Sequence, residues 1–225
     1  MTAYLGIDGF GFAVQSIGME TDWAAENLRV IRTLMERSAV YRRALAPLMG
    51  AVGLAGVAAA IVAPFAPVRS PRAFAGYWMA VAAICLAGAF LLIRRQALND
   101  AEPFWSPPTR RAAQALSPAF FAGFATGLMF LCAEPRTPLA VGLLVPGWMV
   151  LYGCGVHAAG FFMPRGFKLF GWLFIAGGCV LGAAMSFGPA PALSWMHWAM
   201  GVIFGGSHLA YGIYLYFTEK HGNAT

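Results

Sequence analysis

Six stretches of about twenty predominantly apolar residues divide this chain, and they constrain its fold more than any other feature. They cover residues 45–66, 73–93, 115–133, 139–163, 169–187 and 194–217. The hydrocarbon core of a bilayer is about 30 Å thick, and an α-helix needs about 20 apolar residues to cross it. No Asp, Glu, Lys or Arg falls inside any of these stretches. The sequence therefore predicts an all-α, polytopic membrane bundle of six transmembrane helices.

The overall composition supports a chain surrounded by lipid. Of its 225 residues, 60% are hydrophobic and only 11% are charged. A soluble domain carries roughly 25% charged residues, because water must solvate its surface. Prolines gather in the connections between the apolar stretches, where water can satisfy the backbone groups that proline leaves free.

The basic residues predict the orientation of the bundle. With the N-terminus inside, twelve of the fifteen Lys and Arg residues fall on the cytoplasmic side, and only Arg69, Arg72 and Arg136 fall outside. This alternation is the positive-inside bias, which gives both termini a cytoplasmic location. Arginine outnumbers lysine 13 to 2, which is typical of a GC-rich bacterial genome. We therefore expect a bacterial inner membrane protein whose net charge of +6 attracts anionic lipid headgroups, with no need of a nucleic-acid partner.

Outside the apolar stretches, the chain divides into three further segments. Residues 1–21 are predicted to be a disordered tail, and the alternative is that translation starts at Met19. Residues 22–43 are predicted to form a cytoplasmic amphipathic helix, with Asp22 as its N-cap. This helix lies either in the headgroup layer or against another protein or a neighbouring protomer. The transmembrane domain then covers residues 44–217, and residues 218–225 form a cytoplasmic tail.

A resemblance to a known group rests on the segment before the first apolar stretch. The sequence AENLRVIRTLMERSAVYR at residues 25–42, followed by six apolar stretches, resembles a family of uncharacterised bacterial six-helix inner-membrane proteins. The sequence EPFWSP at residues 102–107 belongs to the same resemblance. The resemblance implies a location and a topology, and it implies no activity and no functional residues.

Glycines at four-residue spacing mark faces where helices are expected to pack. Small residues allow helix backbones to approach closely where no hydrophobic effect drives helices together. The prediction is packing within the bundle, and the alternative is a homo-oligomer interface. The pairs are Gly123 with Gly127, Gly178 with Gly182, and Gly201 with Gly205, and a comparable stripe holds Gly50, Gly53 and Gly56.

Polar side chains within the apolar stretches are the candidate site. His157 and His208 belong to the fourth and sixth stretches, which run in the same direction, so their rings could face one another. Tyr211 shares the face of His208, and Cys154 shares that of His157. One interpretation is two histidines that hydrogen-bond between helices and pack the bundle. The functional alternatives are cofactor binding, as in haem ligation or a quinone pocket, and a proton relay or transport role. His197, beside Trp195 and Trp198, is expected at the membrane interface.

No catalytic signature stands out. The four cysteines have no CxxC spacing, so neither a metal site nor a disulfide framework is predicted. Catalytic residues, metal ligands and a bound cofactor are therefore not predicted, and the chain is expected not to be an enzyme. The leading hypothesis is an accessory, sensory or scaffolding membrane component with a cytoplasmic partner. The alternatives are a small-solute transporter or channel, and a redox protein associated with haem or quinone.

Overall fold

The computed structural model describes two helical residues near the N-terminus and most of the chain from Leu45 onwards. The described residues are 27–28, 45–99, 104–105, 107–132, 142–163, 166–188 and 191–222. The chain divides into two compact units, Met1–Arg43 and Ala44–Thr225. Asn27 and Leu28 are helical. The rest of the amphipathic helix predicted at residues 22–43 lies outside the described residues.

The second unit is a bundle of helices, and its described part contains no strand. The first span, Leu45–Phe65, ends in a turn of 3₁₀ helix, η1 (Ala63–Phe65). A π-helix, η2 (Gly201–Gly206), joins α7 to α8 without a break in helical backbone. The remaining elements are α2 (Pro71–Asn99), α3 (Pro107–Cys132), α5 (Leu144–Ala159), α6 (Gly166–Phe187), α7 (Leu193–Met200) and α8 (Ser207–Gly222).

Four helices are long and apolar enough to cross a membrane. They are Leu45–Phe65, Pro71–Asn99, Thr109–Cys132 and Gly166–Phe187. These coincide with the first, second, third and fifth predicted spans. The prediction of an all-helical protein is therefore confirmed for the described residues, and four of its six predicted spans are helices with the length and composition that a membrane crossing needs. The fourth predicted span contains α5, whose 16 residues extend about 24 Å. The sixth corresponds to the run α7–η2–α8.

Two helices are longer than the apolar stretches that predicted them. α2 continues to Asn99, beyond Arg94 and Arg95. Long basic side chains at a helix end can reach water or headgroups, so charge there does not stop the helix. α3 begins at Pro107, eight residues before the predicted start at residue 115. Proline suits the first position of a helix, because its fixed φ is helical and its missing N–H has no partner there.

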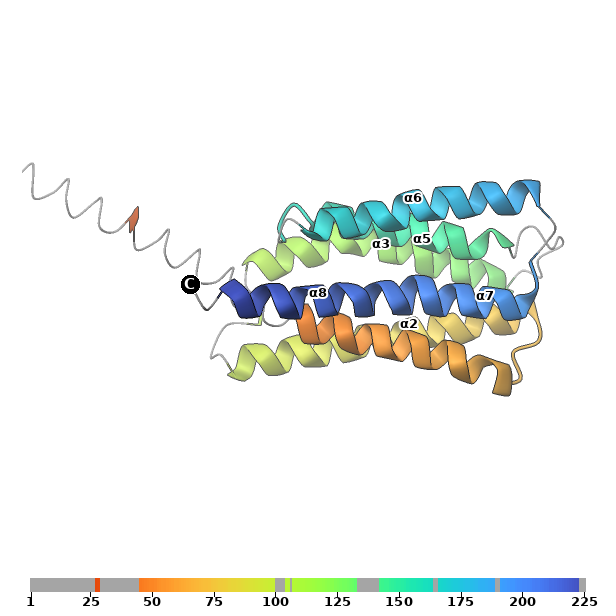
Figure 1. The fold of residues 1–225 in the computed structure, drawn as a ribbon, viewed down its shortest axis with the longest axis horizontal. Helices are drawn as coiled ribbons and strands as arrows, with labels where there is room; N and C mark the ends of the chain where they lie inside the picture. The colour runs from red at the N-terminus through yellow and green to blue at the C-terminus, as the bar shows by residue number, and fades with distance from the viewer. Residues whose placement is uncertain are drawn as a thin grey trace, which may run out of the picture. The chain divides into compact units, whose positions relative to one another are not determined.

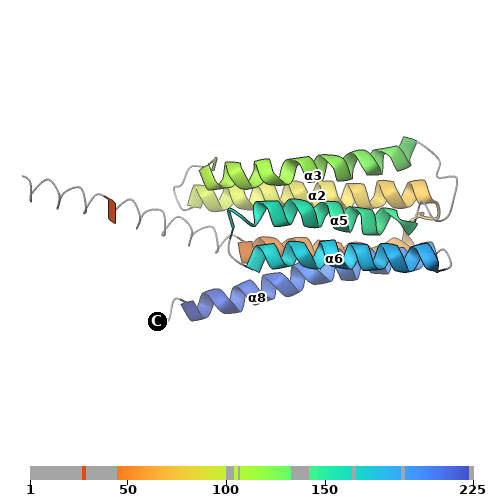
Figure 2. The same ribbon diagram turned by 90° about the horizontal axis from the view of Figure 1, so that it is seen from above.

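Consecutive helices run in opposite directions along a common axis (Figures 1 and 2). One end of the bundle, the arginine-rich end, carries Arg94, Arg95, Arg110, Arg111 and Lys168 where α2 ends and where α3 and α6 begin. Arg69, in the connection after the first span, and Arg72, in the first turn of α2, lie at the opposite end.

The first span and the run α7–η2–α8 are in backbone contact through glycines. A Cβ atom placed on Gly53 would lie 2.5 Å from the backbone nitrogen of Leu209, and one on Gly205 would lie 2.6 Å from that of Val57. One on Gly212 would lie 2.8 Å from the backbone nitrogen of Gly50. Only glycine fits at Gly53, Gly205 and Gly212, because a backbone atom cannot rotate away as a side chain can. These glycines therefore serve packing within the bundle, as predicted for the Gly201–Gly205 pair.

α5 and α6 form a second glycine-mediated interface. A Cβ on Gly153 would lie 2.8 Å from the carbonyl oxygen of Gly171, and one on Gly171 would lie 2.6 Å from the backbone nitrogen of His157. A Cβ on Gly178 would lie 2.9 Å from the carbonyl oxygen of Pro146. Packing within the bundle is therefore confirmed for Gly178 too.

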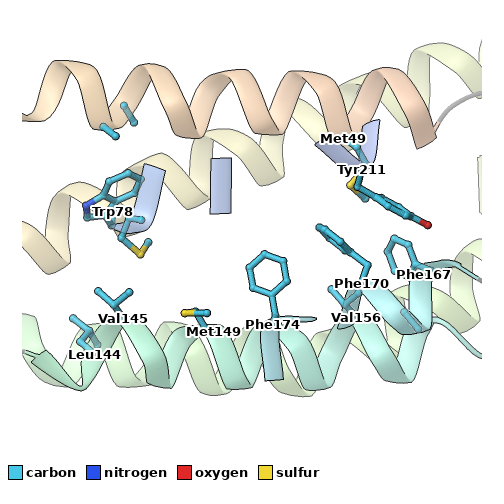
Figure 3. Close-up of a cluster of buried hydrophobic side chains, with 14 of the residues drawn as sticks. Met49, Trp78, Leu144, Val145, Met149, Val156, Phe167, Phe170, Phe174 and Tyr211 are labelled. Atoms are coloured by element: carbon cyan, nitrogen blue, oxygen red, sulfur yellow. The ribbon is translucent and has the colours of Figure 1, made fainter. Parts of the chain in front are cut away.

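The centre of the bundle is a cluster of buried aromatic and aliphatic side chains (Figure 3). Phe74 and Phe174 are fully buried, as is Val145. The outer surface is also apolar: Phe121 is 75% exposed, Val180 70% and Ile84 69%. Exposed apolar side chains on every long helix fit a protein whose solvent is lipid.

Candidate functional site

His208, at the start of α8, bonds to Tyr152 of α5. The Tyr152 hydroxyl lies 2.5 Å from His208 Nε2, and His208 Nδ1 lies 2.5 Å from the carbonyl oxygen of Phe204. His208 is only 3% exposed. The bond joins residues that are 56 positions apart in sequence, so it fixes α5 against the run α7–η2–α8, the last helical run.

The two partners determine which nitrogen of His208 carries the proton. A carbonyl oxygen can only accept, so Nδ1 must be the donor to Phe204. In the neutral ring Nε2 is then an acceptor, and the Tyr152 hydroxyl donates to it. Both nitrogens of His208 are satisfied in this way, as a buried polar side chain requires.

Aromatic rings enclose the Tyr152–His208 pair. The centroid of the Phe174 ring lies 4.9 Å from that of Tyr152 and 5.7 Å from that of His208. The Phe170 and Phe204 rings complete the enclosure, at 5.1 Å from His208 and 5.6 Å from Tyr152. Aromatic pairs in such tilted and edge-to-face geometry contribute about 0.5–1.5 kcal/mol each beyond their buried area. We call Tyr152, Phe170, Phe174, Phe204 and His208 the central cluster.

The π-helix η2 delivers the carbonyl that His208 uses. Its last turn includes Phe204, whose carbonyl oxygen also accepts the backbone N–H of Ser207. A carbonyl has two lone pairs, so it can accept from Ser207 and from His208 together. π-Helical turns are rare and often occur at functional sites. In this turn the Phe204 carbonyl accepts a hydrogen bond from His208, and Gly205 packs against the first span.

Tyr211 adjoins the central cluster, as its spacing from His208 predicts. Its ring stacks on that of Phe170 at 4.6 Å between centroids, with 15° between the planes. The hydroxyl of Tyr211 is buried and has no hydrogen-bond partner among the described residues.

His157 has a different set of neighbours from His208. Its ring contacts those of Phe161 and Trp172, and its Nδ1 lies 3.4 Å from the carbonyl oxygen of Lys168. The described ring contacts of His208 include neither His157 nor these neighbours. The structure therefore brings Tyr211 and His208 to one cluster and leaves His157 on the side of α5 that faces the start of α6. Cys154 is exposed. Cofactor binding by His157 and His208 stays an untested alternative.

A second buried histidine was assigned only an interfacial position from the sequence. His197 of α7 is 4% exposed, whereas its neighbours Trp195 and Trp198 are 47% and 50% exposed. The Trp78 indole N–H of α2 donates to His197 Nδ1 at 3.0 Å. Indole is a donor only, so the neutral His197 ring carries its proton on Nε2, which has no partner among the described residues. No sequence spacing relates α2 to α7, so this pair could not be predicted.

Tyr152 is a residue that sequence reasoning missed although a signal was available. A tyrosine hydroxyl in the middle of an apolar stretch needs a partner, because lipid offers none.

No protein-family model, no curated protein and no solved structure matches this chain.

The chemistry open to these residues follows from their hydrogen bonds. No group of three or more His, Cys, Asp or Glu side chains in the described ranges is placed to hold a metal ion. A histidine that binds a metal through Nε2 usually donates Nδ1–H to a carbonyl or carboxylate, as His208 does. The Nε2 lone pair of His208, however, already accepts from Tyr152, so a metal or haem would have to displace that hydroxyl. As it stands, the pair joins two helices.

Proposed function

We propose that this chain is a non-enzymatic component of a bacterial inner membrane, with an accessory, sensory or scaffolding role. In this proposal six helices cross the bilayer, both termini are cytoplasmic, and α5 and the run α7–η2–α8 are the fourth and sixth crossings. The bundle acts as a compact anchor, and its cytoplasmic segments contact the partner. The chain's resemblance to six-helix inner-membrane proteins agrees with this arrangement.

The observation that carries the proposal is the closeness of the helices on two sides of the central cluster. Backbone contacts at Gly53 and Gly205 close the first span against the last helical run, and those at Gly153 and Gly171 close α5 against α6. Between these interfaces the aromatic rings of the central cluster fill the interior. A path for a solute needs polar groups that can be exposed to water, whereas Tyr152 and His208 use their hydrogen bonds on each other and on the backbone.

The distribution of charge supports both the proposed orientation of the bundle and the proposed surfaces for a cytoplasmic partner. Arg94 and Arg95 lie in the last two turns of α2, and Arg110 and Arg111 lie in the first turns of α3, at the same end of the bundle. This end would face the cytoplasm and its anionic lipid. The proposed partner surfaces are the segment at residues 22–43 and the loop between α2 and α3, where most of the polar sequence is placed.

Accessibility of single cysteines distinguishes an anchor from a transporter. In a variant with the four native cysteines replaced by alanine, Val156→Cys and Met149→Cys place thiols at positions only 1% and 3% exposed, on either side of Tyr152. We expect a charged, membrane-impermeant maleimide to leave both unlabelled in right-side-out and inverted vesicles. Both side chains are buried among the described helices, so a charged reagent should not reach them.

Two exposed positions serve as controls for the labelling. Ser70→Cys, directly before α2, should react in right-side-out vesicles, and Leu98→Cys, at the end of α2, in inverted ones. Labelling of Val156→Cys or Met149→Cys from both sides, at rates near those of the controls, would establish a water-filled path. The chain would then be a transporter or channel, and the anchor proposal would be wrong.

A further inference from the structure

The Tyr211 hydroxyl is a buried donor that the described structure leaves without a hydrogen bond. Tyr211 is 9% exposed, and its ring is fixed by stacking on Phe170 and by contact with Phe167. The hydroxyl is directed away from the centre of the bundle, towards the end where Phe167 lies (Figure 3). A buried polar atom without a partner costs about 1–3 kcal/mol, so such an atom usually has a role or a ligand.

This hydroxyl lies against the first residue of α6. A Cβ atom on Gly166 would be only 3.2 Å from the Tyr211 oxygen, so the glycine allows the hydroxyl to approach the helix start. The first N–H groups of a helix have no carbonyl partner within that helix, and the helix dipole adds partial positive charge there. α6 has 22 residues, so the peptide dipoles of a full-length helix contribute to the positive charge at its first turn. Hydroxyl and helix start together form an arrangement that favours an anion.

The same turn carries a lysine at the boundary of the membrane. Lys168 is in the first turn of α6, and its Nζ lies 3.7 Å from the centroid of the Phe161 ring, in the connection that follows α5. α6 is one of the helices that can span a bilayer, so its first turn reaches headgroup depth. The arginine-rich end is also where positive charge gathers. The phosphate of a phospholipid is the anion that is abundant at this depth.

We propose that the start of α6 and the Tyr211 hydroxyl bind the phosphate group of an anionic phospholipid. The backbone N–H groups of the first turn and the Tyr211 O–H donate to the phosphate oxygens, and Lys168, whose ammonium lies over Phe161, adds positive charge to the surroundings of the same helix start. The inference requires only that α6 span a membrane, and it holds whether the chain is an anchor or a transporter.

Lipid retention by the full-length protein tests this site. The detergent-purified protein is exposed to phosphatidylglycerol or to phosphatidylcholine, and bound lipid is counted by native mass spectrometry. We expect preferential retention of phosphatidylglycerol and about a tenfold weaker retention in Tyr211→Phe, since a charge-assisted hydrogen bond is lost. The phenylalanine keeps the stacking on Phe170. Tyr214→Phe is the matched control, because Tyr214 is on the same helix and 57% exposed.

Two further variants separate the parts of the site. Lys168→Gln should weaken retention about fivefold, the effect of one basic residue near an anionic surface. Gly166→Ala removes no donor and should weaken retention because its methyl group crowds the Tyr211 hydroxyl. Equal retention by Tyr211→Phe and Tyr214→Phe would overturn the proposal, as would equal retention of the two lipids by the wild type. If millimolar inorganic phosphate displaced phosphatidylglycerol and bound alone, the ligand would be a soluble phosphate, and the assignment to lipid would be wrong.

Discussion

Replacing Gly205 by alanine is expected to lower the stability of the bundle by about 3 kcal/mol, and leucine at the same position is expected to prevent folding. The added Cβ would lie 2.6 Å from the backbone nitrogen of Val57 and 2.9 Å from the carbonyl carbon of Gly56. Neither backbone atom can rotate away, so the first span and the last helical run must separate. Separation would remove their van der Waals contact, which is the main force between helices in lipid. Unfolding by sodium dodecyl sulfate in mixed micelles, followed by tryptophan fluorescence, measures the loss.

Gly50→Ala is the matched control for this prediction. Gly50 belongs to the same glycine stripe of the first span, but a Cβ there has no atom within 4 Å. The substitution should be neutral or stabilising by up to about 1 kcal/mol, because alanine favours a helix more than glycine does. If Gly205→Ala and Gly50→Ala unfolded at the same detergent concentration, the backbone contact would not be what holds these helices together.

Tyr152→Phe is expected to destabilise the bundle by about 1–2 kcal/mol. The substitution removes the hydroxyl that donates to His208 Nε2 and leaves a buried acceptor without a partner. His208→Phe should have a similar cost, because the Tyr152 hydroxyl then becomes the unpaired group. The same unfolding experiment measures both effects, and Tyr214→Phe, at an exposed position of α8, should change little.

The double variant Tyr152→Phe with His208→Phe tests whether the hydrogen bond between these two side chains serves only the stability of the bundle. Replacing both partners by apolar rings can be nearly neutral, so the double variant should be more stable than the sum of the single losses implies. We expect a coupling of about 1 kcal/mol, within the range of hydrogen bonds between membrane helices. A stable double variant that retained its cellular role would assign the pair to architecture. Strictly additive losses would show that the two side chains do not interact.

The helices themselves were largely predictable from the sequence, because lipid imposes a simple requirement on length and composition. The runs at residues 45–66 and 73–93 appear as the helices Leu45–Phe65 and Pro71–Asn99. Helix ends were less predictable: α2 passes Arg94 and Arg95, which an apolar criterion excludes although a helix end tolerates them. The short α5 and the π-helical turn in the last run depend on local backbone geometry that hydropathy does not report.

The partners of the polar side chains were harder to predict than their positions. His208 and Tyr211 were correctly placed on one face by their three-residue spacing, which is a local property of a helix. The partner of His208 is Tyr152, and that choice depends on how α5 and α8 are rotated against each other. The shared direction of the fourth and sixth stretches did not bring the rings of His157 and His208 together, because rotation about the helix axis also decides which side chains meet. Because the sequence does not give the rotation of each helix, the bond between Trp78 and His197 could not be predicted either.

The central claim is that six helices cross the membrane and keep the arginine-rich end inside. Fusions of a reporter that is active only outside the cytoplasm, placed after Ser70, Asp100, Arg136, Arg165, Ala190 and Thr225, test every crossing. The account predicts activity after Ser70, Arg136 and Ala190 and none after Asp100, Arg165 and Thr225. Arg136 and Arg165 are decisive, because α5 is the shortest of the proposed crossings. Reporters that behaved alike at these two positions would contradict the six-helix account.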